Sequence, residues 1–241
     1  MLYRLRIPKH GCSIMMVHIP NVLTQAQVQA CRQALETAPW VEGKLTAGSL
    51  TAPRKNNMQV PAAHPIARRL SEMIMESLKK NAIFMRAALP LRLVPPLFNR
   101  YTPGEFYGPH VDATVQQAWG VNDRVRSDLS ATLFLSSPEE YDGGELTIVD
   151  DLGERPIKLP AGDLVLYPAT SIHHVSPVTR GARIASFFWI QSMVRDDNLR
   201  GVLYELGTAL AQFEEAVPGN PAITKLTGVY FNLFRLWTDT N

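Results

Sequence analysis

The amino-acid sequence predicts an α+β fold, in which a mainly β core is preceded and followed by helices. The first observation is that residues 91–193 hold short segments rich in β-branched and aromatic residues, punctuated by Gly, Pro and Asp. The second is that the residues on either side of this stretch repeat apolar side chains every three or four positions, as amphipathic helices do. Short, closely spaced strands without helices between them favour an antiparallel sandwich or barrel.

Residues 16–90 are predicted to form a helical support region. A first helix begins near Thr24, because Thr24 and Gln27 have the spacing of a capping box and Leu23 is placed to contact Val28. A second helix begins near Pro65, since proline is favoured at the first helical position. The buried side of this second helix is expected to comprise Ile66, Leu70, Met73, Ile74 and Leu78.

Residues 91–193 supply six strand-like segments bounded by turn residues. Gly143 and Gly144 allow positive φ in a turn that leads into one of these strands. The segments are LRLVPPLFNRY, DLSATLFLS, GELTIVD, RPIKLP, DLVLYP and RIASFFWIQSM. Because the chain shows no internal repeat and no low-complexity linker, we expect one domain with this stretch as its core.

Residues 194–241 return to a helical pattern. One apolar stripe runs from Leu199 to Phe213 and another from Ile223 to Trp237, with Pro-Gly-Asn-Pro between them at residues 218–221. We expect these stripes to pack on the core or across a subunit contact, so the sequence allows a homo-oligomer. At the other end, residues 1–15 are expected to be either an ordered segment or a disordered or upstream-start extension.

Composition excludes several classes of protein. Apolar residues at 46% and charged residues at 19% are ordinary for a globular chain, so disorder is not expected. A net charge of +2 gives no reason to expect nucleic acid or an anionic membrane as partner, and no apolar run approaches the roughly 18 residues that span a bilayer. The two cysteines, Cys12 and Cys31, form no CxxC pair, which favours a reducing, cytoplasmic location.

Candidate metal ligands occur in two places. His110 and Asp112 are two residues apart, so on a strand their side chains project to the same face. They offer two donors of a facial 2-His-1-carboxylate iron site, and the third must come from a later strand. His173 and His174 are available there, 61 and 62 residues after Asp112. Adjacent strand residues point to opposite faces, so only one of the two can join the pair, and alternation does not choose between them.

Arg183 follows the two histidines at the start of the next strand-like segment. Its guanidinium is permanently charged and presents a rigid fork that matches a carboxylate. Near a ferrous site, a buried fork would suit the distal carboxylate of a dicarboxylic co-substrate. An isolated HxD motif often occurs by chance. It is much rarer by chance that three metal donors and an arginine follow one another in this order within a strand-rich region.

These motifs resemble the Fe(II)/2-oxoglutarate-dependent dioxygenases, in their prolyl/lysyl hydroxylase-like branch, and most closely the bacterial PKHD-type hydroxylases. The segments that carry the resemblance are PLFNRY, HVD, DLSATLFLS, YDGGEL, KLPAGDLVLYP, PVTRGAR and ASFFWIQSMVRDD. The resemblance covers about residue 16 to near the C-terminus. It implies a double-stranded β-helix, or jelly roll, over residues 91–193. It also implies Fe(II) and 2-oxoglutarate, with L-ascorbate as reductant.

The resemblance also implies roles for single residues. His110, Asp112 and His173 match the iron ligands, which selects His173 over His174. Arg183 matches the partner of the 2-oxoglutarate C5 carboxylate. Further matches are Tyr101, which reaches that carboxylate or is a buried packing residue, and Trp189, which lies beside the co-substrate or packs in the core. Residues 54–59 are expected to border the pocket, and residues 113–128 to form either a substrate-reading lid or a solvated loop.

The implied activity is hydroxylation of a C–H bond, coupled to oxidative decarboxylation of 2-oxoglutarate to succinate and CO2. The resemblance leaves the substrate open between a peptidyl prolyl or lysyl residue and a siderophore-related small molecule, the latter linked to iron uptake. Two alternatives to the hydroxylase are a cupin-type metalloenzyme that does not use 2-oxoglutarate and a non-catalytic binding or iron-sensing protein. Cupins usually carry HxH and a nearby Glu, whereas this chain has HxD and a placed arginine.

Overall fold

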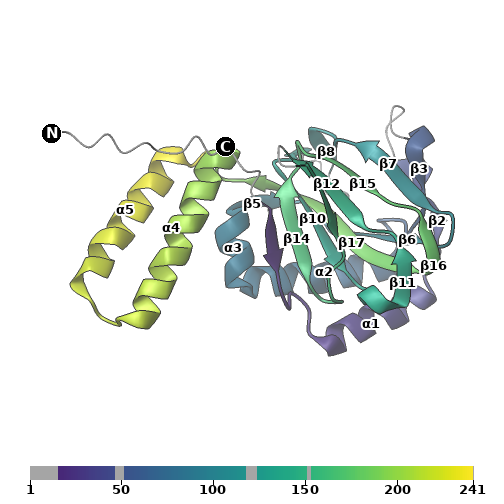
Figure 1. Cartoon of the computed structure of the whole chain (residues 1–241), viewed down its shortest axis with the longest axis horizontal. Coiled ribbons are helices and arrows are strands. Elements are labelled where there is room, and N and C mark those ends of the chain that lie inside the picture. Colours follow the sequence, from purple (N-terminus) through teal and green to yellow (C-terminus); the bar gives the residue numbers. More distant parts are fainter. Residues whose placement is uncertain (1–15, 47–51, 118–123, 151–152, 241) are drawn as a thin grey trace.

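The computed structural model describes residues 16–46, 52–117, 124–150 and 153–240. The predictions made for residues 1–15 lie outside these ranges. Figure 1 shows two parts, a sheet-rich core flanked by α1, α2 and α3, and a helical hairpin of α4 and α5 that projects from one end of that core. Within the described ranges, no helix is both long and apolar enough to cross a membrane.

The N-terminal helices form where the sequence predicts them. In α1 (Gln25–Glu36), Thr24 and Gln27 form both halves of a capping box, and Leu23 and Val28 are both buried in the main core. Helix α2 (Pro65–Lys80) begins at Pro65, and its predicted apolar side is buried or packed against the same core. Helix α3 (Ala82–Ala88) was not predicted, because seven residues are too few to establish a helical period.

The larger sheet has eight strands. Its order is β1 (Val17–Ile19), β14 (Leu164–Pro168), β10 (Leu129–Phe134), β17 (Arg183–Ser192), β6 (Leu97–Tyr101), β4 (Met58–Gln59) and β2 (Val41–Glu42), with β5 (Pro90–Leu93) paired to β17. All the pairings are antiparallel. Strands β1, β2 and β4 come from the region predicted to be helical, and at two or three residues they are too short to show a period-two alternation.

The smaller sheet completes the jelly roll. Its order is β13 (Gly153–Ile157), β12 (Leu146–Asp150), β15 (Ile172–Val175), β7 (Phe106–His110) and β3 (Lys55–Asn56), again antiparallel throughout. Two short ribbons join β11 (Tyr141–Gly143) to β16 (Val178–Gly181) and β8 (Val115–Gln117) to β9 (Arg124–Arg126). Three 3-10 turns lie at Gly43–Thr46, Ala52–Arg54 and Pro138–Glu140.

Side chains along each strand of the large sheet point alternately to its two faces, and the two faces border different hydrophobic cores. Leu133 and Phe188 are packed in the same cluster as helices α1 and α2. Phe134 and Tyr167 instead belong to a second cluster, whose other members include Leu146 and Ile148 of the small sheet. The second cluster therefore fills the interior between the two sheets, and side chains on this inner face can share one site.

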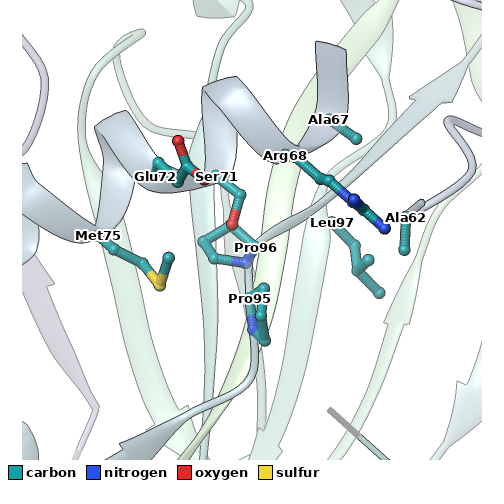
Figure 2. A pocket seen from close by; sticks show the side chains of 9 residues that line it. All are labelled: Ala62, Ala67, Arg68, Ser71, Glu72, Met75, Pro95, Pro96 and Leu97. Atoms are coloured by element: carbon teal, nitrogen blue, oxygen red, sulfur yellow. The ribbon is translucent and has the colours of Figure 1, made fainter. Parts of the chain in front are cut away.

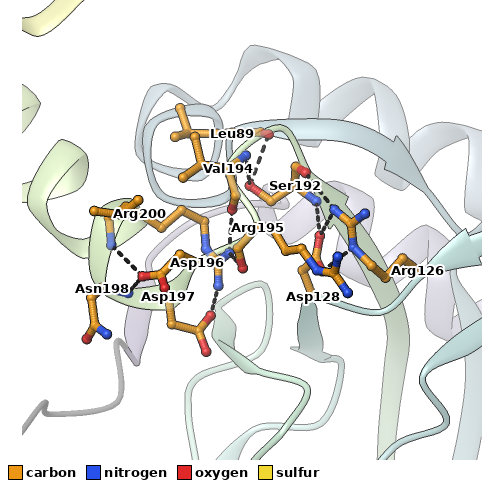
Figure 3. Close-up of polar contacts among 11 residues, drawn as sticks. Leu89, Arg126, Asp128, Ser192, Val194, Arg195, Asp196, Asp197, Asn198 and Arg200 are labelled. Atoms are coloured by element: carbon orange, nitrogen blue, oxygen red, sulfur yellow. Dashed lines mark hydrogen bonds and ion pairs between the residues drawn. The ribbon is translucent and has the colours of Figure 1, made fainter. Parts of the chain in front are cut away.

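A buried arginine joins the C-terminal hairpin to the core. Helix α4 (Asp197–Ala216) is capped by Asp196 and is followed by α5 (Pro221–Trp237). Arg200 is fully buried and donates to the carbonyl oxygens of Val194 at 2.6 Å and Arg195 at 3.1 Å, and it also pairs with Asp197 (Figure 3). Burial lowers the pKa of Arg200 to about 10.

The same junction holds a second ion pair. Arg126 donates to Asp128 through two nitrogens, at 2.7 and 2.9 Å, and Asp128 accepts from the Ser192 backbone N–H at 2.9 Å (Figure 3). Ser192 ends β17 and Arg126 ends β9. The network therefore fixes three segments together: the strand of Arg183, the β8–β9 ribbon and the start of the C-terminal hairpin.

Candidate active site

The fold brings His110, Asp112 and His173 together at one end of the small sheet. His110 ends β7 and is the direct cross-strand partner of His173 on β15. Asp112 follows two residues after β7. One donor atom from each of the three side chains lies within 4.8 Å of the others, so the three could hold one metal ion. The Asp112 carboxylate oxygens lie 3.9 Å from His110 Nε2 and 3.6 Å from His173 Nε2.

Backbone carbonyls orient both imidazoles. His110 Nδ1 lies 2.9 Å from the Gly108 carbonyl oxygen, and His173 Nδ1 lies 3.0 Å from that of Ser171. Because a carbonyl oxygen only accepts, each Nδ1 carries the proton and each Nε2 keeps a free lone pair. Both Nε2 atoms can therefore coordinate a metal ion.

The surroundings keep this donor set in its ligating form. Ser130 Oγ donates to Asp112 Oδ2 at 2.6 Å and fixes the rotation of the carboxylate. Burial, and then repulsion from His173, lowers the pKa of His110 to about 4, so the imidazole is neutral at physiological pH. Two imidazoles and one carboxylate are the donors of the facial iron(II) site of non-haem oxygenases.

His174 lies outside the cluster. It sits opposite Thr147 of β12, whereas His173 sits opposite Ile148 and His110. His174 is half-buried, and its Nδ1 atom makes no hydrogen bond among the described residues. Strand alternation predicts that one of the two histidines faces away from His110, and the tertiary structure places His174 in that position.

Arg183 and Tyr101 meet on the inner face of the large sheet. They are direct cross-strand partners of β17 and β6, and both are 1% exposed. The guanidinium carbon lies 5.4 Å from the centre of the Tyr101 ring and 5.3 Å from that of Phe134. Arg183 Nε has no hydrogen-bond partner among the described residues. Burial raises the pKa of Tyr101 to about 12, with Arg183 acting in the opposite direction, so the phenol remains a donor.

Two further polar side chains lie next to this pair, Tyr141 beside Arg183 and Asn57 beside Tyr101. Tyr141 is fully buried, and its hydroxyl has no hydrogen-bond partner within the described ranges, while burial raises the pKa of the phenol. Asn57 is 3% exposed and lies beside Tyr101, yet neither polar atom of its amide meets hydrogen-bond geometry with a described residue. The family resemblance predicts that residues 54–59, which include Asn57, border the pocket, whereas the sequence analysis gives Tyr141 no role in the site.

Tyr167 shows that the metal cluster and Arg183 share one interior. Its ring meets the His173 ring edge-on at 5.2 Å. Burial raises the pKa of Tyr167 well above its ordinary value, and the charges of Asp112 and Arg183 act on it with opposite signs. An anionic ligand held by Arg183 would therefore lie in the same space as the candidate metal.

A buried lysine lies on the other side of the cluster. Lys55 on β3 pairs with Tyr107, and its Nζ lies 5.3 Å from the centre of the Tyr107 ring. That ring in turn stacks on His110 at 3.6 Å. Burial lowers the pKa of Lys55 to about 8, although the Asp112 carboxylate acts to raise it. The site thus carries a second cationic side chain, which the sequence pattern does not distinguish.

Trp189 packs against the β8–β9 ribbon next to Ser130. Trp189 is the cross-strand partner of Ser130, whose hydroxyl bonds Asp112, and it packs on Val94 and Val125. Within residues 113–128, the structure describes both strands of the ribbon but not residues 118–123, so the predicted lid lies partly outside the described residues. A separate hollow of about 190 Å³ between α2 and the β5–β6 link contains none of these residues (Figure 2).

A jelly roll with a facial His-Asp-His set and a buried arginine on the same interior defines the class of 2-oxoglutarate- and iron(II)-dependent oxygenases. Comparison with known families agrees. Residues 96–191 match the 2OG-Fe(II) oxygenase superfamily, and residues 197–239 match the PKHD-type hydroxylase C-terminal domain. A PKHD-type hydroxylase of Methylobacillus flagellatus is 53% identical over 94% of this chain and its own full length. One of Burkholderia cenocepacia is 54% identical over 93% of this chain and its own full length. The chain therefore belongs to the PKHD-type hydroxylases.

Solved structures share the fold at low sequence identity. A Pseudomonas putida prolyl-4-hydroxylase is 19% identical, with a TM-score of 0.51, and the match covers 74% of this chain and 93% of that one. The carbocyclase SnoK from nogalamycin biosynthesis is 18% identical, with a TM-score of 0.53 and coverage of 75% and 81%. At these identities the likeness concerns the fold alone, and the two proteins are named for different reactions, so the fold does not fix the substrate.

Proposed function

We propose that His110, Asp112 and His173 bind the catalytic Fe(II) and that Arg183 binds the distal carboxylate of 2-oxoglutarate. The observation that carries this proposal is the burial of Arg183 in the same interior, between the two sheets, that holds the three donors. A buried guanidinium without a partner for its Nε is costly, and a carboxylate ligand supplies both the charge and the acceptors that it lacks.

The donor set and the arginine fit the two groups. When bound, iron and 2-oxoglutarate supply the oxidising chemistry that consumes O2, releases succinate and CO2, and converts a substrate C–H bond to C–OH. His110, Asp112 and His173 would hold the metal through three donors and would leave coordination positions open for 2-oxoglutarate and O2. Ser130 holds the Asp112 carboxylate in a fixed orientation, and the carbonyls of Gly108 and Ser171 fix the two imidazoles.

Tyr101 and Asn57 complete the proposed carboxylate pocket. Tyr101 is buried beside Arg183 and Asn57 is buried beside Tyr101, and Tyr101 keeps its phenolic proton because of its raised pKa. A phenol and an amide can each donate one hydrogen bond to the carboxylate oxygens that the guanidinium leaves unfilled. Tyr141, whose hydroxyl is buried, is the third candidate donor for this carboxylate.

The substrate that we propose is a peptidyl prolyl or lysyl residue or a siderophore-related small molecule, the latter in connection with iron uptake. The support is the motif resemblance described above. L-Ascorbate is the proposed reductant that keeps the iron ferrous. We also propose a cytoplasmic location, which the use of cysteine supports, because Cys31 is a buried free thiol whose pKa burial raises to about 12.

Turnover of the co-substrate tests the proposal directly. The purified chain, supplied with Fe(II), ascorbate, 2-oxoglutarate and O2, is expected to release succinate at a low uncoupled rate and at a higher rate with its true substrate. A screen of peptides and of siderophores, followed by mass spectrometry for the addition of one oxygen atom, identifies the substrate class. Absence of iron-dependent succinate under all these conditions would favour the non-catalytic binding or iron-sensing alternative.

A further inference from the structure

Exposed apolar side chains are concentrated on the C-terminal hairpin. Ten large apolar side chains are exposed in the described part of the chain, and six of them lie on α4, on α5 or on the link between the two helices. Exposed apolar side chains on a monomer are normally scattered singly over the surface, whereas here most of them are gathered on one projecting helical hairpin. The six are Val202, Val217, Leu226, Val229, Phe231 and Leu236.

Helix α5 carries two apolar stripes. The inner stripe includes Tyr230, Phe234 and Trp237, which pack with Leu203 of α4 in the cluster that joins the hairpin to the core. We define the outer stripe as Leu226, Val229, Leu233 and Leu236, whose spacings of three, four and three place them along one side of the helix.

Most of the outer stripe is exposed within the described part of the chain. Leu226 is 40% exposed, Val229 50% and Leu236 76%, whereas Leu233 is half-buried against α4. The helix has only two charged residues, Lys225 and Arg235, among its 17. A helix that is apolar on two sides is normally buried on both, so the outer stripe requires a partner.

We propose that this partner is a second copy of the chain, with the outer stripes of two α5 helices packed against each other. Apolar residues at this spacing form a self-complementary ridge, which suits a two-fold symmetric contact. A contact between two such helices buries on the order of 1,000 Å² in total, at the low end for specific interfaces. The dimer is therefore expected to dissociate on dilution.

Charge favours a second copy over a membrane. Helix α4 has four acidic residues and one basic residue, and α5 has two basic residues, so the hairpin carries −3 and +2, or −1 in total. Two nearly neutral hairpins approach each other without strong repulsion. A helix that binds anionic lipid instead carries a row of Lys and Arg beside its apolar face, and this hairpin lacks one.

The molar mass in solution tests the proposal. Light scattering behind size-exclusion chromatography is expected to give about twice 26.9 kDa for the native chain at high concentration. Val229→Glu and Leu236→Glu are each expected to halve that mass, because a carboxylate would be buried in the contact. Thr224→Glu is the matched control: Thr224 is an exposed polar residue on another side of α5, and its variant should keep the mass of the native chain.

A second measurement does not depend on the stability of the glutamate variants. In a Cys12→Ser background, Val229→Cys is expected to form an intermolecular disulfide on mild oxidation, while Thr224→Cys is not. The remaining Cys31 is buried and does not compete. A native chain that stays monomeric at high concentration, or a dimer that neither glutamate variant dissociates and Val229→Cys does not cross-link, would overturn the proposal. The outer stripe lies apart from His110 and Arg183, so uncoupled turnover tests the proposed activity separately.

Discussion

Replacing Arg183 by alanine tests whether this guanidinium anchors 2-oxoglutarate. Arg183 is 1% exposed and is flanked by the rings of Tyr101 and Phe134 at 5.4 and 5.3 Å, so a carboxylate bound there is shielded from water. Removing one partner of a buried charge pair costs about 3–5 kcal/mol. Since each 1.4 kcal/mol is a factor of ten, the Kd for 2-oxoglutarate should rise by roughly 100- to 4,000-fold.

The assay measures binding and turnover separately. Binding of 2-oxoglutarate to the metal-loaded chain under anaerobic conditions gives Kd, and succinate release in air gives KM. Arg183→Lys keeps the charge but loses the fork, so its Kd should lie between those of the native chain and the alanine variant. Arg180→Ala is the matched control, because Arg180 is three residues away but its side chain is 59% exposed and paired with Asp142 at 2.6 Å.

The result for Arg183→Ala is interpreted together with its thermal unfolding. A folded Arg183→Ala chain that binds 2-oxoglutarate as tightly as the Arg180→Ala control would refute the assignment of the co-substrate pocket. Loss of binding in both variants would show that general surface charge, rather than the buried fork, attracts the dianion.

Three further predictions concern the metal site and the hairpin. His173→Ala should abolish iron-dependent succinate release, whereas His174→Ala should retain most of it; the opposite outcome would exchange the two residues. Ser130→Ala should weaken Fe(II) binding about tenfold, because the 2.6 Å bond that orients Asp112 is lost; an unchanged metal titration would contradict this role. Arg200→Ala should destabilise the chain by about 3 kcal/mol, because loss of the buried guanidinium leaves the Val194 carbonyl and Asp197 without their donor; an unchanged denaturant midpoint would contradict this role of Arg200.

The sequence by itself determined the class of fold, through local patterns that need no distant contact. A capping box at Thr24 and Gln27 specifies where α1 begins, because both of its hydrogen bonds are made within one turn. Pro65 likewise specifies where α2 begins, because it occupies the first helical position. The HxD motif likewise places His110 and Asp112 near each other, since they are only two residues apart.

Other parts of the fold could not be predicted from local pattern. Strands β1 to β4 have two or three residues each and are stabilised by pairing with strands that are distant in sequence, such as β14 and β6. The inner and outer stripes of α5 also look alike in sequence, because all the residues are apolar. Which stripe is covered is decided by where α4 packs, and that is a tertiary contact.

For the site too, the sequence decided some features and the tertiary structure decided others. Alternation established that His173 and His174 face opposite sides, and only the cross-strand pairing of β15 with β7 placed His173 beside His110. Arg183 carries its chemistry in its side chain, but its burial beside Tyr101 follows from the register of β17 on β6. Asn57 lies beside Tyr101 and Tyr141 lies beside Arg183, although 84 residues separate Asn57 from Tyr141 in the chain. Sequence determined which groups were available, and the closure of the two sheets decided which of them meet, because register acts between strands that no local pattern connects.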